Sequence, residues 1–410
     1  MSKAPPGDIG FREFVTLMAS LIAMVALSID AMLPALLAIG DELNAANPND
    51  PQLVIGLFFL GMAFAQLVYG PLSDSFGRKP TIFLGLVIYL AGSALCLMSW
   101  SLPALIAGRV IQGIGAAGPR IVANAIIRDR YEGRPMARVS SLVMSVFIVV
   151  PVLAPLLGQG IMALSNWRMI FWFLAAMAGA LLLWSVVRLP ESLSPENRKP
   201  FRIKPIASAV REVLRNRLSL GCTLCMGLVF SSFLAFLSSA QQVLGEAYGL
   251  GDLFPVTFSC LAIVVGLTSA VNSNLVMRLG MQRLATIGVC TIITASALYA
   301  LWFAVFGVPP LVVALIWLAF SIGSIGIVFG NLNAMAMEPL GHIAGVGAAV
   351  VGALSSLISA LIGSQIARSY DGTALPIALG YMVCGACALT ALWWATKGRV
   401  RRNRSKESTE

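Results

Sequence analysis

The chain has 410 residues, of which 58% are hydrophobic and only 11% are charged, and its formal net charge is +10. A soluble globular protein carries about 25% charged residues. This sequence cannot cover a water-exposed surface, so its composition excludes an ordinary soluble enzyme or binding domain. The positive charge is explained by membrane topology, as argued below, and does not require a nucleic-acid partner.

Long apolar runs follow one another along the whole chain. A membrane helix needs roughly 20 predominantly apolar residues, and runs of about that length lie between charged residues and Pro or Gly. The predicted fold class is an all-α membrane protein with 12 transmembrane helices in two six-helix bundles. The helices are expected at 14–36, 52–72, 81–100, 103–126, 139–161, 167–188, 218–243, 254–278, 284–306, 310–335, 345–367 and 374–396.

The connection after the sixth run divides the chain into halves. Residues 189–217 are polar and basic and contain several prolines. The segments 72–79 (LSDSFGRK) and 275–282 (LVMRLGMQ) each follow the second run of their half, which favours two parallel repeats of six helices. We expect an N-terminal six-helix bundle at 1–188, a cytoplasmic linker at 189–217, a C-terminal six-helix bundle at 218–396 and a basic cytoplasmic tail at 397–410.

The distribution of Lys and Arg predicts the orientation of the chain. If the N-terminus is cytoplasmic, most of the 28 Lys and Arg residues fall in cytoplasmic segments, from Lys3 to Lys406. Cytoplasmic loops of membrane proteins carry such an excess. The first apolar run is longer than the 7–15 residues typical of a signal-peptide core, so we expect it to remain. The prediction is a multi-pass protein of the inner (cytoplasmic) membrane with both termini cytoplasmic.

Two opposite charges lie at similar depth in the first and fourth predicted helices. Asp30 is the only acidic residue placed well inside a predicted span, and Arg109 lies in the run 103–126. An ionised side chain at such a place costs roughly 2.5–3.5 kcal/mol on insertion scales. Both residues are about six positions, or roughly 9 Å, from the outer end of their helix. We hypothesise that they contact each other directly or through one water molecule.

An apolar environment favours the neutral form of a carboxyl group, whereas a nearby cation favours the ionised form. A carboxyl group under both influences can bind and release a proton near physiological pH. Asp30 is therefore the candidate proton carrier. Arg109 cannot lose its own proton and would act as a fixed charge. The alternative is a permanent ion pair that only orders the two helices.

Weaker candidates for substrate contact lie elsewhere in the spans. Arg120 can attract an anionic or carbonyl-bearing substrate, or it can snorkel toward the cytoplasm. In the stretch FSSFLAFLSSAQQ (230–242), Phe233 and Phe236 are one helical turn apart and are followed by Gln241. These two rings line a pocket in one interpretation and face lipid in the other.

The loop GPLSDSFGRKP (70–80) is the most specific motif of the chain. Gly70 and Gly77 permit close backbone approach or positive φ, and Asp74 and Arg78 give a short loop both signs of charge. By itself the loop is also typical of a tight, positive cytoplasmic turn. In sequence and placement it resembles motif A of the major facilitator superfamily.

Three further stretches resemble the drug:proton antiporter branch of that superfamily. RVIQGIGAAG (109–118) is similar to motif B, with Arg109 as its arginine. APLLGQG (154–160) resembles motif C, with Pro155 and Gly158 matching and Ala154 and Gln159 in place of Gly. IDAMLPAL (29–36) and AIIRD (125–129) resemble the bicyclomycin and chloramphenicol resistance (Bcr/CflA) subgroup. That subgroup often has an arginine where this chain has Asn124, and Arg120 lies four residues earlier.

The resemblance implies a proton-coupled secondary transporter that exports drug-like or small amphipathic compounds, as in phenicol or multidrug efflux and antibiotic resistance, by alternating access. It implies a monomer that is not an enzyme and needs no cofactor or metal, with a small-molecule substrate, protons and the lipid bilayer as partners. Gating is expected from Gly70, Asp74, Gly77, Arg78, Pro155 and Gly158, where Asp74 and Arg78 hold the cytoplasmic side closed and Pro155 and Gly158 shape an interface between the halves. Substrate contact is expected from Asp30, Arg109, Arg120, Asn124, Phe233, Phe236 and Gln241.

Other functions remain open at this point. An exporter or a proton symporter of an endogenous metabolite fits the same fold. A non-transporting membrane receptor or scaffold fits the composition, but it leaves the duplicated halves and the intramembrane charges unexplained. No phosphate-binding loop of the form G-x-x-x-x-G-K-[ST] occurs in the sequence, which argues against ATP-driven export by this chain alone.

Overall fold

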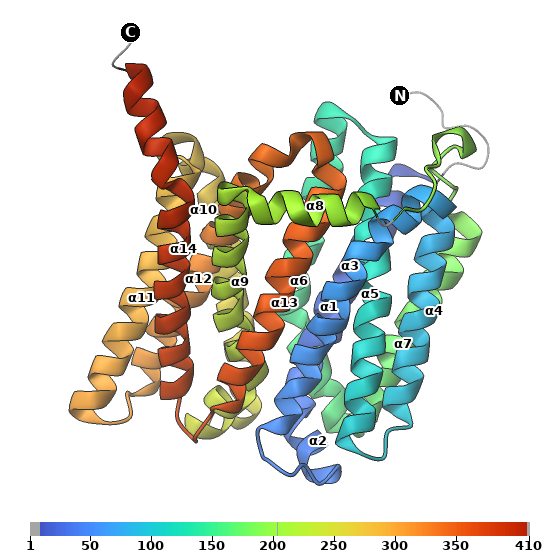
Figure 1. Cartoon of the computed structure of the whole chain (residues 1–410). Helices are drawn as coiled ribbons and strands as arrows, with labels where there is room; N and C mark the ends of the chain where they lie inside the picture. The colour runs from blue at the N-terminus through green and yellow to red at the C-terminus, as the bar shows by residue number, and fades with distance from the viewer. Residues whose placement is uncertain (1–8, 203, 408–410) are drawn as a thin grey trace. The chain divides into compact units, whose positions relative to one another are not determined.

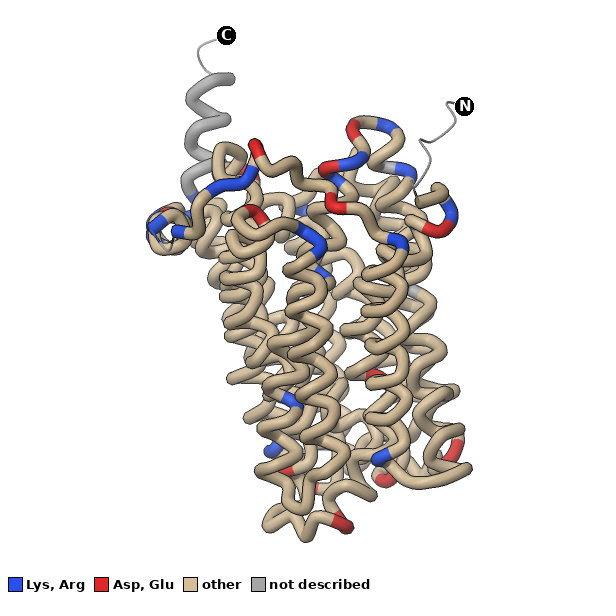
Figure 2. The backbone as a smooth tube through the Cα atoms, turned by 90° about the vertical axis from the view of Figure 1, so that its right-hand side faces the viewer, with Lys and Arg blue, Asp and Glu red and all other residues tan. Residues whose placement is uncertain are grey.

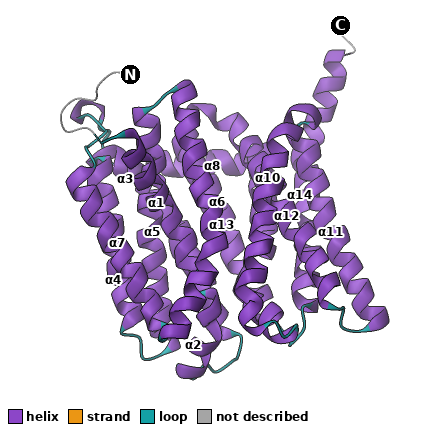
Figure 3. Cartoon of the chain, turned by 180° about the vertical axis from the view of Figure 1, so that it is seen from behind, coloured by secondary structure: helices purple, strands orange, loops and turns teal. Residues whose placement is uncertain are grey.

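The computed structural model describes residues 9–202 and 204–407, and it describes side chains except those of 137, 147, 148 and 398–407. Lys3 and residues 408–410 lie outside this part of the chain, and the rest of the predicted basic tail continues the last helix to Glu407. Every regular element among the described residues is helical (Figures 1 and 3). The long helices are α1 (Phe11–Asp30), α3 (Leu53–Phe76), α4 (Arg78–Leu97), α5 (Leu102–Arg130), α6 (Gly133–Leu164), α7 (Arg168–Arg188), α9 (Arg217–Ala240), α10 (Phe254–Leu279), α11 (Met281–Phe306), α12 (Leu311–Met337), α13 (Ala344–Arg368) and α14 (Leu375–Glu407).

Shorter helices interrupt or join these twelve. Eleven segments are long and apolar enough to cross a membrane, because α12 and α13 are joined through a short helix into the single segment Leu311–Arg368. The all-helical prediction with twelve long helices is confirmed. The short elements are η1 (Leu33–Ala35), α2 (Leu36–Glu42), η2 (Asp50–Gln52), η3 (Pro195–Asn197), α8 (Lys204–Arg215), the π-helical η4 (Gln241–Ala247), η5 (Gly251–Leu253) and η6 (Glu338–Ile343).

The chain divides into two compact units. Unit 1 comprises Met1–Ile203 and Asp252–Ala262, and unit 2 comprises Lys204–Gly251 and Ile263–Glu410. Within each unit, Lys, Arg, Asp and Glu are concentrated at the ends of the helices, and the middle of the helices is almost free of charge (Figure 2). This distribution is the one that a hydrocarbon environment requires, because charges at the bilayer centre are costly.

Unit 1 is organised around α5, which packs against α3, α4 and α1. Small residues permit this packing. A Cβ atom added to Gly113 would overlap the carbonyl oxygen of Phe58 in α3, and one added to Gly115 would overlap the backbone nitrogen of Tyr89 in α4. Without a hydrophobic driving force between helices in lipid, close backbone approach of this kind is a main source of stability.

Unit 2 is organised around α9, which packs against α13, α14 and α12. Its linker contains a helix that the sequence did not predict. α8 is amphipathic, buries Ala209 and Val213, and packs on α13 and α9. His342 of η6 lies 3.0 Å (Nε2) from Glu212 Oε1 of α8. The prolines and charges of 189–217 concealed this short helix, whose stability comes from packing.

The glycine packing of α5 yields a first prediction. Gly113→Ala forces its new methyl group against the Phe58 carbonyl, so we expect a loss of about 1–3 kcal/mol of stability, as for other overpacked interiors. Gly179→Ala in α7 is the matched control, since nothing lies within 4 Å of its Cβ position. The control should gain about 0.5–1 kcal/mol from the better helix former. Thermal unfolding in detergent measures both, and equal melting temperatures would contradict the packing argument.

Candidate functional site

The first membrane helix is broken at Asp30. α1 ends at this residue, and the chain continues through a turn into η1 and α2. Pro34 has no N–H group and cannot donate to the carbonyl of Asp30 four residues earlier. The N–H of Met32 donates to the Ile29 carbonyl at 3.2 Å, in the i−3 pattern of a tightened turn. The carbonyl of Ser28 therefore does not receive its helical donor from Met32.

Arg109 of α5 supplies a donor to that carbonyl. Its Nη2 lies 3.1 Å from the Ser28 oxygen, and its Nε donates to the Val54 carbonyl of α3 at 3.1 Å. Its Nη1 donates to Oε1 of Gln112 at 2.5 Å, and its guanidinium carbon lies 4.5 Å from the centre of the Phe58 ring. The side chain is 0% exposed. A buried guanidinium is tolerated when its donors are satisfied, and Arg109 joins α5 to α1 and α3 in this way.

The network continues into α4 through side chains. The Ser28 hydroxyl lies 2.5 Å from the Tyr89 hydroxyl and donates to the Met24 carbonyl at 2.6 Å. Gln112 Nε2 donates to the Ser93 hydroxyl at 2.8 Å. Four helices of unit 1 thus meet in a buried polar network beside the break in the first helix.

Asp30 does not belong to this network. Its side chain is 5% exposed, and residues two positions apart on a helix do not face the same side, so Asp30 is turned away from Ser28. Among the described residues the Asp30 carboxyl group makes no hydrogen bond or ion pair. The structure therefore does not show the direct contact with Arg109 that depth alone suggested, because the guanidinium is bound to backbone carbonyls and Gln112.

α6 packs against the same break from another side. A Cβ atom at Gly158 would overlap the Ala31 carbonyl and would lie 3.1 Å from Cγ of Pro34. Pro155, one turn earlier, is buried. The structure places the motif C-like stretch of this helix against the segment after Asp30, inside unit 1. Only glycine allows this approach of the two backbones.

Arg120 and Asn124 lie further along α5. Arg109 and Arg120 are eleven residues apart, which places them on similar faces of the helix and about 16 Å apart along its axis. Arg120 is half-buried, its Nη1 lies 3.7 Å from Sδ of Met62, and among the described residues it has no acidic partner. The exposed Asn124 donates from Nδ2 to the Arg120 carbonyl at 2.9 Å. Arg120 is thus a cation whose charge no described acidic side chain neutralises.

The predicted residues of the C-terminal half have different environments. Phe233 is half-buried, with its ring centre 5.5 Å from that of Phe230. Phe236 is fully buried in the packing of α9 and is not part of an open wall. Gln241 begins the π-helix η4, and its Oε1 is buried without a hydrogen-bond partner among the described residues. Single π-turns of this kind are frequent at functional sites.

The motif A-like stretch is helical except at Gly77, which lies between α3 and α4, so the expected loop is shorter than predicted. Its charged side chains form a compact cluster. Arg78 Nη1 contacts Asp74 Oδ1 at 2.5 Å, and Arg78 Nε donates to Asp129 Oδ2 at 2.8 Å. Gly77 has φ = +106°, which favours glycine, and a Cβ there would lie 2.6 Å from Oε2 of Glu191. Gly70 has open space around its Cβ position. The cluster joins the ends of α3, α4 and α5.

Glu191 and Asp129 are the members of the cluster that sequence reasoning missed. Glu191, just after α7, accepts from the backbone N–H groups of Arg78 (2.9 Å) and Lys79 (3.1 Å). It thereby caps the start of α4, where unpaired N–H groups attract negative charge. The acids themselves are visible in the sequence, in PES (190–192) and AIIRD (125–129). No spacing rule, however, connects either of them with Arg78, which is more than 50 positions away.

The fold and this site define a multi-helix membrane transporter with two helical units and a buried acid at a broken helix. The model of the Major Facilitator Superfamily matches residues 18–364, and the chain belongs to this superfamily of secondary transporters. It is 29% identical over 396 residues to the uncharacterized MFS-type transporter YdgK of Bacillus subtilis, covering 94% of this chain and 97% of that protein. It is 27% identical over 399 residues to the bicyclomycin resistance protein homolog of Haemophilus influenzae, covering 95% of this chain and 97% of that protein.

Solved structures show the same fold. The partially occluded inward-open structure of the xylose transporter XylE from E. coli superposes with a TM-score of 0.72 at 15% sequence identity, covering 95% of this chain and 99% of that chain. At this identity the likeness concerns the fold alone. The family match makes this chain a transporter of small molecules and not an enzyme.

The network beside the break yields a second prediction. Tyr89→Phe removes the hydrogen bond between α4 and Ser28 and should lower the free energy of unfolding by about 1 kcal/mol. Tyr69→Phe is the matched control, because the Tyr69 hydroxyl is buried without a hydrogen-bond partner in the described structure. Its removal should be neutral or stabilising. Thermal unfolding of the two variants in detergent measures the difference, and equal losses would show that the Ser28 contact adds nothing.

Proposed function

We propose that this transporter couples inward movement of protons to export of drug-like or small amphipathic compounds, of the phenicol and multidrug type, by alternating access. Two observations support the proposal. Full-length relatives include a bicyclomycin resistance protein homolog. Asp30 is the only buried carboxyl side chain among the described residues.

The environment of Asp30 carries the argument for proton coupling. A buried carboxyl group without an ion-pair partner is tolerated in its neutral form, whereas its ionised form is costly. If the site around Asp30 opened to water on one side of the membrane, the ionised form would become the favoured one. Each inward proton gains about 2.3 kcal/mol per 100 mV of membrane potential, which can drive an opposing substrate uphill by more than tenfold. In the proposed cycle Asp30 releases its proton to the cytoplasm as substrate binds and regains one from outside.

Arg109 acts in this proposal as a fixed charge and a positioning residue. Its bond to the Ser28 carbonyl holds the end of α1 and thereby the orientation of Asp30. Arg120 attracts anionic or carbonyl-bearing groups of the substrate, and Asn124 offers an exposed amide one turn further along α5. In unit 2, the half-buried Phe233 offers a ring for substrate contact. Gln241 offers an amide oxygen that has no hydrogen-bond partner among the described residues, and Phe236 contributes through packing.

The remaining assignments follow the sequence pattern. The cluster of Asp74, Arg78 and Asp129 stabilises the closed cytoplasmic side, and Gly158 lets α6 move with the broken helix. The basic segments orient both termini toward the cytoplasm, and bacterial relatives favour the cytoplasmic membrane as the location. We expect a monomer, since each chain supplies both units.

Proton coupling is tested in proteoliposomes with an imposed pH gradient, using a compound to which the gene raises resistance in a susceptibility panel. Wild type should move protons and compound in opposite directions. Asp30→Asn should abolish gradient-driven uphill transport, because the side chain can no longer bind or release a proton. Asp41→Asn in α2, an exposed acid of the same broken segment, is the control and should transport normally. Unchanged coupling in Asp30→Asn refutes the proton-carrier role, and flux in the same direction indicates a symporter.

The role of Arg120 gives a separate prediction. Arg120→Gln should raise KM for a carbonyl-bearing or anionic substrate about tenfold or more, since hydrogen bonds to charged groups contribute about 1.5–3 kcal/mol. Its proton coupling should persist. Arg134→Gln, an exposed arginine in the first turn of α6, is the control. A KM equal to that of wild type would place Arg120 outside the substrate site.

A further inference from the structure

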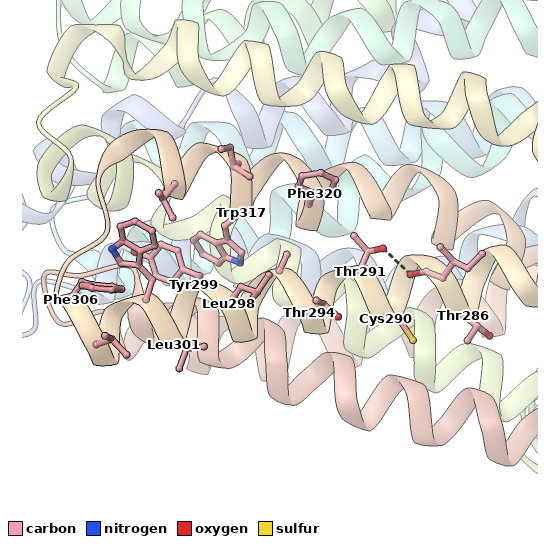
Figure 4. Close-up of a pocket in the computed structure, with 16 residues that line it drawn as sticks. Thr286, Cys290, Thr291, Thr294, Leu298, Tyr299, Leu301, Phe306, Trp317 and Phe320 are labelled. Atoms are coloured by element: carbon pink, nitrogen blue, oxygen red, sulfur yellow. Dashed lines mark hydrogen bonds between the residues drawn. The ribbon is translucent and has the colours of Figure 1, made fainter.

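Unit 2 contains an apolar groove that the proposed transport cycle does not use. It lies between α11 and α12 and has a volume of about 920 Å³. On α11 its lining runs from Thr286, near the start of the helix, to Phe306 at its end (Figure 4). Twenty residues of helix span about 30 Å, which is the thickness of the bilayer hydrocarbon core.

The polar groups along the groove are largely paired within the protein. Thr286 and Thr291 donate their hydroxyls to the carbonyls of Gln282 and Ile287, each at 2.9 Å (Figure 4 shows the second bond). The Trp317 indole donates to the Ser296 hydroxyl at 3.0 Å, and the Tyr299 and Tyr248 hydroxyls are 2.8 Å apart. A drug-sized ligand site normally presents a few convergent polar groups. This groove offers methyl, methylene and ring surfaces instead, which suit hydrocarbon.

A positive charge continues the groove at one end. Arg283 is exposed and lies three and four residues before the lining residues Thr286 and Ile287. Residues at these spacings share one face of a helix, so Arg283 stands in line with the apolar lining. The opposite end leads into the loop 307–310, which contains no charged residue. A cation at one end of a hydrocarbon groove complements an amphiphile with an anionic head.

We propose that this groove binds the acyl chains of an anionic phospholipid whose headgroup phosphate pairs with Arg283. A second copy of the chain fits the surface less well. Helix interfaces in membranes favour small residues that let backbones approach, whereas Leu298, Leu301 and Phe320 are large and stand 58–61% exposed. Gaps between such side chains accommodate a flexible chain better than another helix.

The experiment uses the purified full-length transporter in detergent with phosphatidylglycerol or phosphatidylcholine of identical acyl chains, and native mass spectrometry counts retained lipid. Wild type should retain phosphatidylglycerol about fivefold better than phosphatidylcholine, as expected for one arginine near an anionic headgroup. Arg283→Gln should remove this preference. Arg134→Gln, an exposed arginine in the first turn of α6 in unit 1, loses the same charge and should keep the preference.

A second variant tests the hydrocarbon part of the site. Thr294→Trp fills the groove and should reduce retention of both lipids, while an unchanged elution volume shows that the protein is folded. Equal retention of the two lipids by wild type, or an unchanged preference in Arg283→Gln, overturns the proposal. A dimer that Thr294→Trp dissociates also overturns it. None of these readouts depends on transport, so the inference stands or falls separately from the proposed export function.

Discussion

The hydrogen bond from Arg109 to the Ser28 carbonyl is the interaction on which the rest of unit 1 depends. It satisfies a backbone group at the end of a broken helix, where Ser28 and Arg109 are both 0% exposed and the carbonyl is shielded from bulk water. The same guanidinium also binds the Val54 carbonyl and Gln112. A bond to a charged donor contributes about 1.5–3 kcal/mol, and leaving its acceptor buried and unpaired costs a comparable amount. Pro34 interrupts the helix, and these contacts hold the end of α1 and hence Asp30 in place.

This arrangement gives Asp30 and Arg109 different environments. The cation is permanently satisfied by neutral groups and the Phe58 ring. The acid, turned to the other side of its helix, is left without an ion-pair partner in the described structure. A permanent Asp30–Arg109 ion pair would remove the reason for Asp30 to exchange protons. In the proposed function, this geometry leaves the protonation of Asp30 responsive to the access of water and substrate.

The sequence predicted the features that depend on local pattern. Apolar length predicted the long helices. The motif A-like stretch drew attention to Asp74 and Arg78, and the structure shows that they pair at 2.5 Å. Equal depth suggested that Asp30 meets Arg109, but depth does not give the direction in which a side chain leaves its helix. Glu191 at the start of α4 and Gly158 against Ala31 depend on contacts distant in sequence. The fully buried Phe236 likewise owes its environment to neighbouring helices.

The central claim is that substrate binding and proton release compete at Asp30. The most direct measurement is proton release from purified transporter in a weakly buffered detergent solution when an exported compound is added, followed with a pH-sensitive dye. The account predicts release of about one proton per wild-type transporter and none from Asp30→Asn, with compound binding retained in the variant. Equal proton release from wild type and Asp30→Asn would contradict it.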